Sequence, residues 1–402
     1  MPNPYAAVLR RPGAAQFVSA GFVGRLPMSM IPLGVVLLVT DLGGNYAAAG
    51  ALAAVYALSH AAIAPLGARL IDRVGQARVV PVLLAVQLAG LLGFVAVADD
   101  AHPLAVMAIP LGVAGAAAPD IGALVRARWA AMLSGEPGLR SAFAIEGLVD
   151  EVVFIIGPPL VTATAVSVGP VAGLLLCVVL LAVGGIWLAS QRRTQPSPHA
   201  PGRAGPRTPY VGPAFAVVTV SLTAMGAMFG AFEVTTVAFC SEVGQEGLTG
   251  VVLALYAVGS LIAGVVYGAR HVSWPPHRQF VIGSAVLVVV CAPLPFVGSV
   301  GFLMVAVFLA GLAVSPLLIL NVGMVERLVP AVRLTEALTL GTSGIAVGLA
   351  IGSPLAGVLI DTYGAAAGYW IVVAGALMTL LLATVGSATL RRSLVPDDHL
   401  ST

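Results

Sequence analysis

Long apolar runs follow one another along almost the whole chain, and each is long enough to cross a bilayer as a helix. A membrane-spanning helix needs about 20 mostly apolar residues. Only 9% of the 402 residues are charged and 59% are hydrophobic, whereas soluble domains carry about 25% charged residues. A soluble fold is therefore excluded. Twelve spans are predicted, at residues 16–40, 47–66, 79–98, 104–125, 142–166, 171–190, 212–240, 248–267, 279–297, 301–325, 337–360 and 366–386.

The basic residues predict how these spans are oriented. All 19 of them are arginines, and basic residues near span ends are retained on the cytoplasmic side. The short segments after the odd-numbered spans contain none, whereas every arginine except Arg25 lies in the other loops and tails. We therefore expect a multi-pass protein in the plasma membrane of a bacterial cell, with both termini cytoplasmic. Tryptophans also lie near predicted span ends, as interfacial anchors should: Trp129, Trp187, Trp274 and Trp370.

The two halves of the chain resemble each other. Residues 191–213 are rich in Pro, Gly and Arg without apolar periodicity, which predicts a flexible linker between bundles at residues 1–190 and 214–402. Tyr56 in the second span recurs as Tyr256 in the eighth, at an offset near 200 residues. A six-span unit repeated in parallel orientation is typical of transporters that bind their substrate between two halves.

The segment GARLIDRVGQAR, from Gly67 to Arg78, lies between the second and third predicted spans. It resembles the cytoplasmic loop motif of the major facilitator superfamily. The resemblance implies an all-α integral membrane fold of twelve transmembrane helices in two pseudo-symmetric six-helix bundles. The spacing that carries it is that of Asp72, Arg73, Gly75 and Arg78.

Family resemblance implies that this loop latches the cytoplasmic ends of the halves. Gly75 permits the backbone angles of a short turn, and Asp72 can face the N-terminus of a neighbouring helix, where an anion is favoured. A solvated turn with topogenic arginines is the alternative. The sequence departs from the motif at Ala68, where a glycine is usual, and the corresponding loop of the second half has no aspartate. Latching is therefore expected to be asymmetric.

A second, partial resemblance concerns the Gly-Pro motif that drug and proton antiporters of the superfamily place in span 5. Adjacent prolines within a membrane helix remove amide donors and force a kink, which is either purely structural or an antiport-related hinge. Span 4 lacks the arginine that those antiporters usually carry. The matching residues are Gly157, Pro158 and Pro159, with Gly352 and Pro354 in span 11.

Ionisable residues inside the membrane are candidates for substrate binding or proton coupling, because each is costly to place there. Arg25 is expected either to hold an anionic substrate group or to pair with a carboxylate. Glu146 and Asp150 share one helix face at i to i+4 spacing. Two neighbouring carboxylates suit proton loading and release, and the alternative is pairing with Arg126, Arg128 or Arg140 at the cytoplasmic surface.

Three further side chains complete the set of candidates. Asp120, near the end of span 4, is favoured as a gating partner of an arginine at position 69, 73 or 78 over a substrate ligand. Glu233 in span 7 has no arginine on its side of the membrane, so it is either a proton carrier or a neutral, hydrogen-bonded side chain. His60 in span 2 either binds substrate or relays protons, or it packs structurally.

These features predict a secondary transporter that moves a small organic solute by alternating access. Proton-coupled efflux of an amphipathic or hydrophobic compound is favoured, because few polar groups are available to line a cavity. The alternative is an importer or facilitator of a sugar, organic anion or amino acid. No HExxH, GxSxG or GxxxxGK[ST] motif indicates an enzyme or a nucleotide site, and the dispersed arginines do not suggest nucleic acid. We expect a monomer in the bilayer, with a small-molecule substrate and protons as partners and no cofactor or metal.

Overall fold

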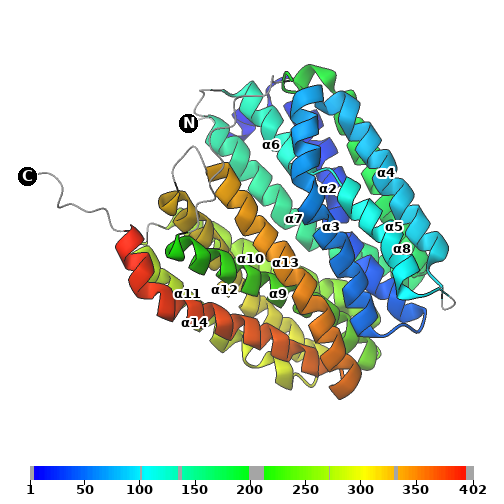
Figure 1. Cartoon of the computed structure of the whole chain (residues 1–402), viewed down its shortest axis with the longest axis vertical. Coiled ribbons are helices and arrows are strands. Elements are labelled where there is room, and N and C mark those ends of the chain that lie inside the picture. Colours follow the sequence, from blue (N-terminus) through cyan, green and yellow to red (C-terminus); the bar gives the residue numbers. More distant parts are fainter. Residues whose placement is uncertain are drawn as a thin grey trace, which may run out of the picture. The chain divides into compact units, whose positions relative to one another are not determined.

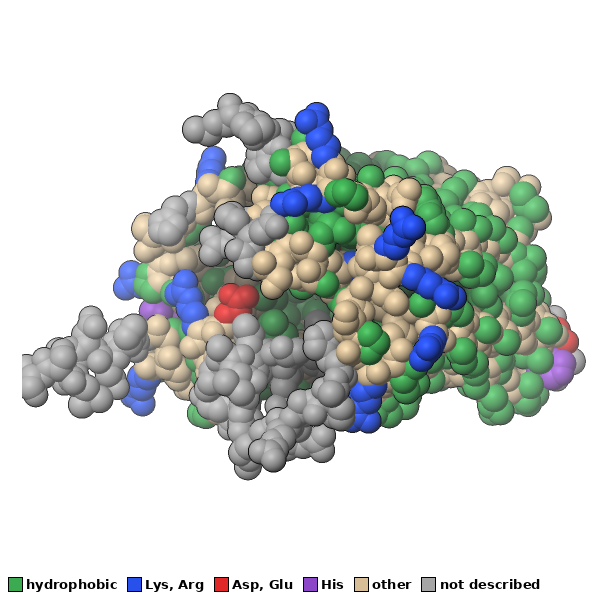
Figure 2. Space-filling view, turned by 90° about the horizontal axis from the view of Figure 1, so that it is seen from above, with side chains coloured by type: hydrophobic (Ala, Val, Ile, Leu, Met, Phe, Trp, Pro, Cys, Tyr) green, Lys and Arg blue, Asp and Glu red, His purple; other side chains and the backbone are tan. Residues whose placement is uncertain are grey.

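The structure is a computed structural model that describes residues 4–99, 102–134, 138–198, 212–270, 272–329 and 334–394. Within these ranges all regular secondary structure is helical (Figure 1), and twelve stretches are long and apolar enough to span a membrane. The expected all-α membrane fold is thereby confirmed. Figure 2 shows hydrophobic side chains covering the flank at its right and arginines on the face turned to the viewer.

The chain divides into two compact units. The first comprises Met1–Gly205 together with Glu246–Ala254, and the second comprises Pro206–Gln245 together with Leu255–Thr402. The long helices of the first unit are α2 (Ala14–Asp41), α3 (Tyr46–Val74), α4 (Gln76–Val97), α5 (Leu104–Ala117), α6 (Ile121–Met132), α7 (Gly138–Ser167) and α8 (Pro170–Ser190), with short helices α1 (Pro4–Leu9) and η1 (Arg192–Thr194).

The remaining long helices are α9 (Pro213–Glu242), α10 (Thr249–Ala269), α11 (Pro276–Cys291), α12 (Val300–Leu328), α13 (Leu334–Tyr363) and α14 (Tyr369–Leu394). Short turns η2 (Glu246–Leu248), η3 (Leu294–Phe296) and η5 (Ala365–Gly368) connect some of them. The helix α10 begins among residues that group with the first unit and continues among those of the second.

The fourth predicted span is two helices, α5 and α6. Ala118 adopts an extended conformation, as expected for a residue that precedes proline, and Pro119 follows it. Asp120 then begins α6, because its carboxylate accepts a hydrogen bond from the Ala123 amide at 2.8 Å. The fourth predicted span, at 104–125, falls within one membrane-span candidate, Leu104–Met132, whose helix is broken at this point.

The sequence repeat corresponds to a repeated packing contact. In the first unit, a Cβ on Gly115 of α5 would overlap the carbonyl oxygen of Tyr56 on α3. In the second unit, a Cβ on Gly311 of α12 would overlap the carbonyl oxygen of Tyr256 on α10. Only glycine allows the two backbones to approach so closely, and small residues serve this purpose in membrane helix pairs. Each tyrosine therefore lies where its unit's second and fourth spans meet.

Candidate functional site

Four charged side chains of the first unit form one ion-paired group, which we call the charge cluster: Arg25 of α2, Arg126 of α6, and Glu146 and Asp150 of α7. The Arg25 guanidinium pairs through Nη2 with Glu146 Oε2 and through Nη1 with Asp150 Oδ1, the second contact at 2.8 Å. The Arg126 Nη2 pairs with the other oxygen of Asp150. Two positive and two negative side chains therefore balance.

The helices place these groups together for simple geometric reasons. Glu146 and Asp150 are one turn apart on α7, so both carboxylates point to the same side. Arg25 lies across from them on α2, and its Nε also donates to the Gly21 carbonyl at 3.2 Å. The adjacent turn is fixed by Ser29, whose hydroxyl donates to the Val153 carbonyl of α7 at 2.9 Å. The alternative expected for Arg25, pairing with carboxylates, is the contact observed.

One end of the charge cluster is buried, and the other end is exposed to solvent. Arg25 is 2% exposed and Glu146 is fully buried, whereas Asp150 is 28% exposed and Arg126 is 40% exposed. Asp150 therefore bridges a buried arginine and an accessible one. Of the two carboxylates, it is the one that water and protons can reach.

Trp129 of α6 holds the buried carboxylate. Its indole Nε1 donates to Glu146 Oε1 at 2.9 Å, so both oxygens of Glu146 have partners. The ring stacks edge-on against Phe17 at a centroid distance of 4.7 Å, and the side chain is fully buried. Trp129 was predicted to be an interfacial anchor. That prediction was wrong, because α6 turns this side chain into the core.

We expect Trp129→Phe to lower the stability of the protein by about 1.5–3 kcal/mol, the usual contribution of a hydrogen bond to a charged group. Phenylalanine preserves most of the packing on Phe17 but leaves one oxygen of Glu146 without a donor. Thermal unfolding of the purified protein in detergent measures the change. Trp187→Phe is the matched control, since Trp187 lies exposed on α8. Equal shifts in the two variants would contradict a specific role for the indole N–H.

Asp120 has a different contact from the one expected. It caps α6 through the Ala123 amide, and among the described residues it forms no ion pair with an arginine of the Gly67–Arg78 segment. By starting α6 at this point, it sets the register that brings Arg126 to the charge cluster. Its contact with the site is therefore indirect. The side chain of Arg140, another expected partner, lies outside the described residues.

The predicted motif segment is mostly helical. Residues 67–74 form the last turns of α3, and α4 begins at Gln76. The turn is Gly75 alone, with φ of 101°, a backbone conformation that favours glycine. Asp72, Arg73 and Arg78 are exposed, and within the described chain none of the three is ion-paired.

Glu233 and His60 both carry a buried polar atom without a partner. Neither Glu233 Oε1 on α9 nor His60 Nδ1 on α3 has a hydrogen-bond partner in the described chain. Glu233 belongs to the second unit and His60 to the first. The two prolines Pro158 and Pro159 lie within the uninterrupted helix α7, and Pro354 lies within α13.

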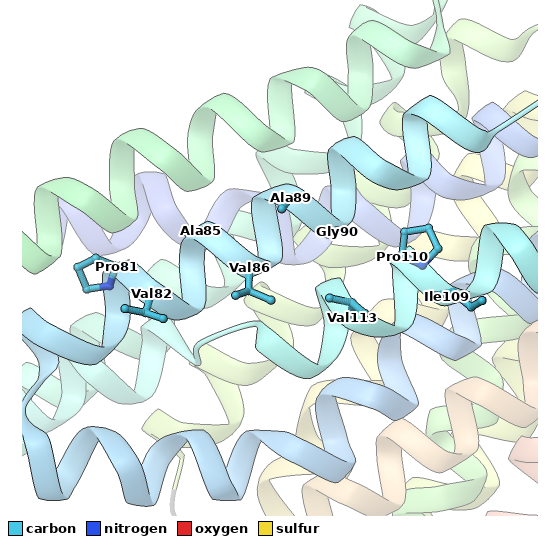
Figure 3. A pocket seen from close by; sticks show the side chains of 9 residues that line it. All are labelled: Pro81, Val82, Ala85, Val86, Ala89, Gly90, Ile109, Pro110 and Val113. Atoms are coloured by element: carbon cyan, nitrogen blue, oxygen red, sulfur yellow. The ribbon is translucent and has the colours of Figure 1, made fainter.

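A groove of about 740 Å³ lies between α4 and α5 on the first unit (Figure 3). It contains no ionisable side chain, and several of its side chains, such as Val82 and Ile109, are exposed. It adds no polar group to the charge cluster, and no cluster of metal-ligating side chains is found among the described residues. The groove is lined by Pro81, Val82, Ala85, Val86, Ala89, Gly90, Ile109, Pro110 and Val113.

Comparisons with known proteins identify the family. The sequence matches the model described as Major Facilitator Superfamily over residues 17–300 and 241–397. No match is found among curated proteins. The nucleoside transporter NupG is similar in structure, with a TM-score of 0.70 at 14% identity, over 94% of this chain and 98% of that chain.

Two further solved structures show the same fold. An auto-inhibited peptide transporter of the POT family has a TM-score of 0.71 at 12% identity, covering 96% of this chain and 99% of its own. A bacterial homologue of the iron transporter ferroportin, in an inward-facing state, has a TM-score of 0.72 at 15% identity, covering 93% and 98%. The protein is a membrane transporter and not an enzyme, and the chain belongs to the major facilitator superfamily.

Proposed function

We propose that this transporter exports an amphipathic or hydrophobic organic compound in exchange for protons, across the plasma membrane and with both termini in the cytoplasm. The charge cluster is the observation that carries the proposal. Asp150 is a part-exposed carboxylate shared by Arg25 and Arg126. Protonation of Asp150 removes one negative charge from a balanced group, so the two arginines must rearrange or find another anion.

This arrangement favours proton coupling over permanent anion binding by Arg25. Its guanidinium already donates to Gly21, Glu146 and Asp150. An anionic substrate would have to displace a carboxylate of the protein, whereas a proton needs only to reach Asp150. Glu146 is held by Arg25 and Trp129 and is buried, so we assign it to holding Arg25 in place and Asp150 to carrying the proton.

Glu233 is proposed as a second proton-binding group. Its Oε1 is buried without a hydrogen-bond partner in the described chain. An unpaired ionised carboxylate is costly in such surroundings. No described residue forms an ion pair with Glu233, so a bound proton relieves this cost. The apolar substrate class is supported by composition, because with only 9% charged residues the spans have few polar groups to line a cavity.

The proposal predicts that Asp150→Asn and Glu233→Gln uncouple transport from protons. Both amides keep the size of the side chain but cannot take up and release a proton. Proteoliposomes loaded with the pH dye pyranine are mixed with amphipathic cations, anions and neutral compounds, and the compound-driven change of internal pH is recorded. We expect the wild type to respond to one class and each amide variant to lose most of that response.

The matched control is Asp41→Asn, at the exposed end of α2 and outside the charge cluster. It is expected to respond like the wild type. Full proton responses in both Asp150→Asn and Glu233→Gln would remove the proposed coupling. A wild-type response to organic anions alone would replace the proposed substrate class.

A further inference from the structure

The linker that follows α8 begins as an ordered segment. Residues Arg192–Thr194 form the short helix η1, and residues 191–198 are described throughout. We propose that residues 191–198 are a docked segment, bound to a site on the first unit that consists of Arg128 and the turn between α3 and α4. This proposal depends on neither the substrate nor proton coupling.

Arg128 of α6 is the centre of the docking site. It is fully buried, and no carboxylate among the described residues pairs with it. Its Nε donates to Gln76 Oε1 at 2.8 Å, and its Nη2 donates to the Leu188 carbonyl at 2.8 Å. Its Nη1 donates to the Gln191 carbonyl at 3.1 Å and to the Thr194 hydroxyl at 2.8 Å. The linker thus supplies two of the acceptors that a buried guanidinium requires.

These acceptors suit a cation although they are neutral. The carbonyls of residues 188 and 191 lie at the end of α8, where the negative end of the helix dipole favours a cation. Each also accepts a hydrogen bond from a backbone amide, from Gln191 at 3.2 Å and from Thr194 at 3.4 Å, and shares its second lone pair with Arg128. A planar guanidinium can donate to several such oxygens at once. If residue 194 moves away, Arg128 loses a partner while it remains buried, and an unsatisfied buried charge is unfavourable. Arg128 therefore favours the docked position of the linker.

A second set of contacts joins the linker to the motif turn. The side-chain Oε1 of Gln195 accepts a hydrogen bond from the Ala77 amide at 3.0 Å. Ala77 lies in the first turn of α4, where amides lack helical acceptors, and Gly75, the residue before the helix, offers no side-chain cap. A Cβ on Gly75 would lie 3.4 Å from Pro198 Cγ. Gln195 therefore caps α4 from outside its own helix.

The two sets of contacts meet at Gln76. Its side chain receives the Arg128 hydrogen bond and donates through Nε2 to the Leu124 carbonyl at 3.2 Å. On the other side of the segment, a Cβ on Gly13 would lie 2.7 Å from Thr194 Cγ2. The turn that ends the Gly67–Arg78 motif and the first residues of the linker therefore form one packed structure. Any movement of this turn has to break or carry with it the linker contacts.

Hydrogen–deuterium exchange of the full-length protein, followed by mass spectrometry of peptides covering residues 72–80 and 191–198, tests the docking site. Thr194→Val keeps the shape of the side chain but removes one of the two acceptors of Arg128 Nη1, together with the hydrogen bond that the hydroxyl donates to the Gln191 carbonyl. Amide exchange reports the population of opened local structure. We expect exchange in both peptides to become about tenfold faster, as the loss of a hydrogen bond to a charged group implies.

Two further variants separate docking from general stability. Arg128→Lys replaces the planar guanidinium, which donates to several acceptors at once, with a single ammonium group that cannot reach them all. It should therefore also accelerate exchange in both peptides. Gln195→Glu places a negative charge at the N-terminus of α4 and should slow exchange in residues 72–80. The control is Ser190→Ala, whose hydroxyl donates only to Trp187 of its own helix and which should leave exchange unchanged.

Thr194→Val decides the outcome, because it is the mildest change. Exchange equal to that of Ser190→Ala in both peptides would overturn the docking site. Faster exchange confined to residues 191–198 would overturn the link to the motif turn. Acceleration spread equally over all helices would show that Thr194 contributes to global stability only, and that result would also overturn the proposal.

Discussion

Arg25→Met is expected to abolish compound-driven proton flux and to destabilise the protein by about 3–5 kcal/mol, the usual cost of breaking a buried ion pair on one side. The methionine fills much of the space but leaves Glu146 fully buried with a negative charge and only the Trp129 indole as donor. Asp150 keeps Arg126 as its partner. The loss of stability should therefore arise mainly from Glu146, the fully buried carboxylate of the charge cluster.

A double variant distinguishes loss of stability from loss of function. Arg25→Met combined with Glu146→Gln removes both members of the buried pair, and replacing both partners of an ion pair is often nearly neutral for stability. We expect this protein to melt close to the wild type but to remain without proton flux, since Asp150 has lost its buried arginine. Thermal unfolding and the pyranine assay measure the two effects. Normal flux in the folded double variant would show that Arg25 has no role in coupling.

Hydropathy predicted the twelve membrane spans, but it did not predict the break between α5 and α6 within the fourth span. Each predicted span corresponds to a helical stretch of the structure, because about 20 apolar residues leave the backbone in lipid few alternatives to a helix. The break between α5 and α6 was missed because its composition is as apolar as a span. The local signal was Pro119 followed by Asp120, an extended residue before proline and then a capping side chain.

The residues of the site were predicted, and two of their contacts were among the predicted alternatives: Arg25 with a carboxylate, and Asp150 with Arg126. Arg25 and Glu146 were singled out because ionisable side chains in membranes are costly, yet they lie 121 residues apart in the chain. Trp129 was misjudged because the end of its helix was placed too early. The docking of residues 191–198 was not predicted, because it depends on single hydroxyl, amide and carbonyl groups that leave no periodic pattern in the sequence.

Among the described residues, the positions of the second unit that match the charge cluster form no ion pair. When the two halves are aligned at Gly157 and Gly352, the position that corresponds to Asp150 is Ile345 of α13. A Cβ on Gly226 of α9 would overlap the Ile345 carbonyl oxygen. The first unit joins its first and fifth spans partly through charged side chains, whereas among the described residues the second joins the equivalent spans by close backbone contact without ion pairs. Rearrangement of this helix pair through a change in its ion pairs is therefore expected only in the first unit.

The close contact of α9 with α13 predicts that Gly348→Ala is strongly destabilising. A Cβ on Gly348 would overlap the Thr223 carbonyl oxygen and lie 2.7 Å from the Ala227 amide nitrogen. Both are backbone atoms, so no side chain can rotate away and the helices must separate. Overpacking costs about 1–3 kcal/mol and occasionally more, and separated helices also lose the van der Waals contact that holds small-residue pairs together in membranes.

Gly323→Ala on α12 is the matched control, because a Cβ there meets nothing within 4 Å. Alanine is favoured over glycine in a helix by about 1 kcal/mol, so this variant should melt at the same temperature as the wild type or higher. The same substitution is thus expected to act in opposite directions at the two positions, as measured by thermal unfolding in one detergent. If Gly348→Ala were as stable as Gly323→Ala, α9 and α13 would have to tolerate separation. The rigid backbone contact that distinguishes the second unit from the first would then be refuted.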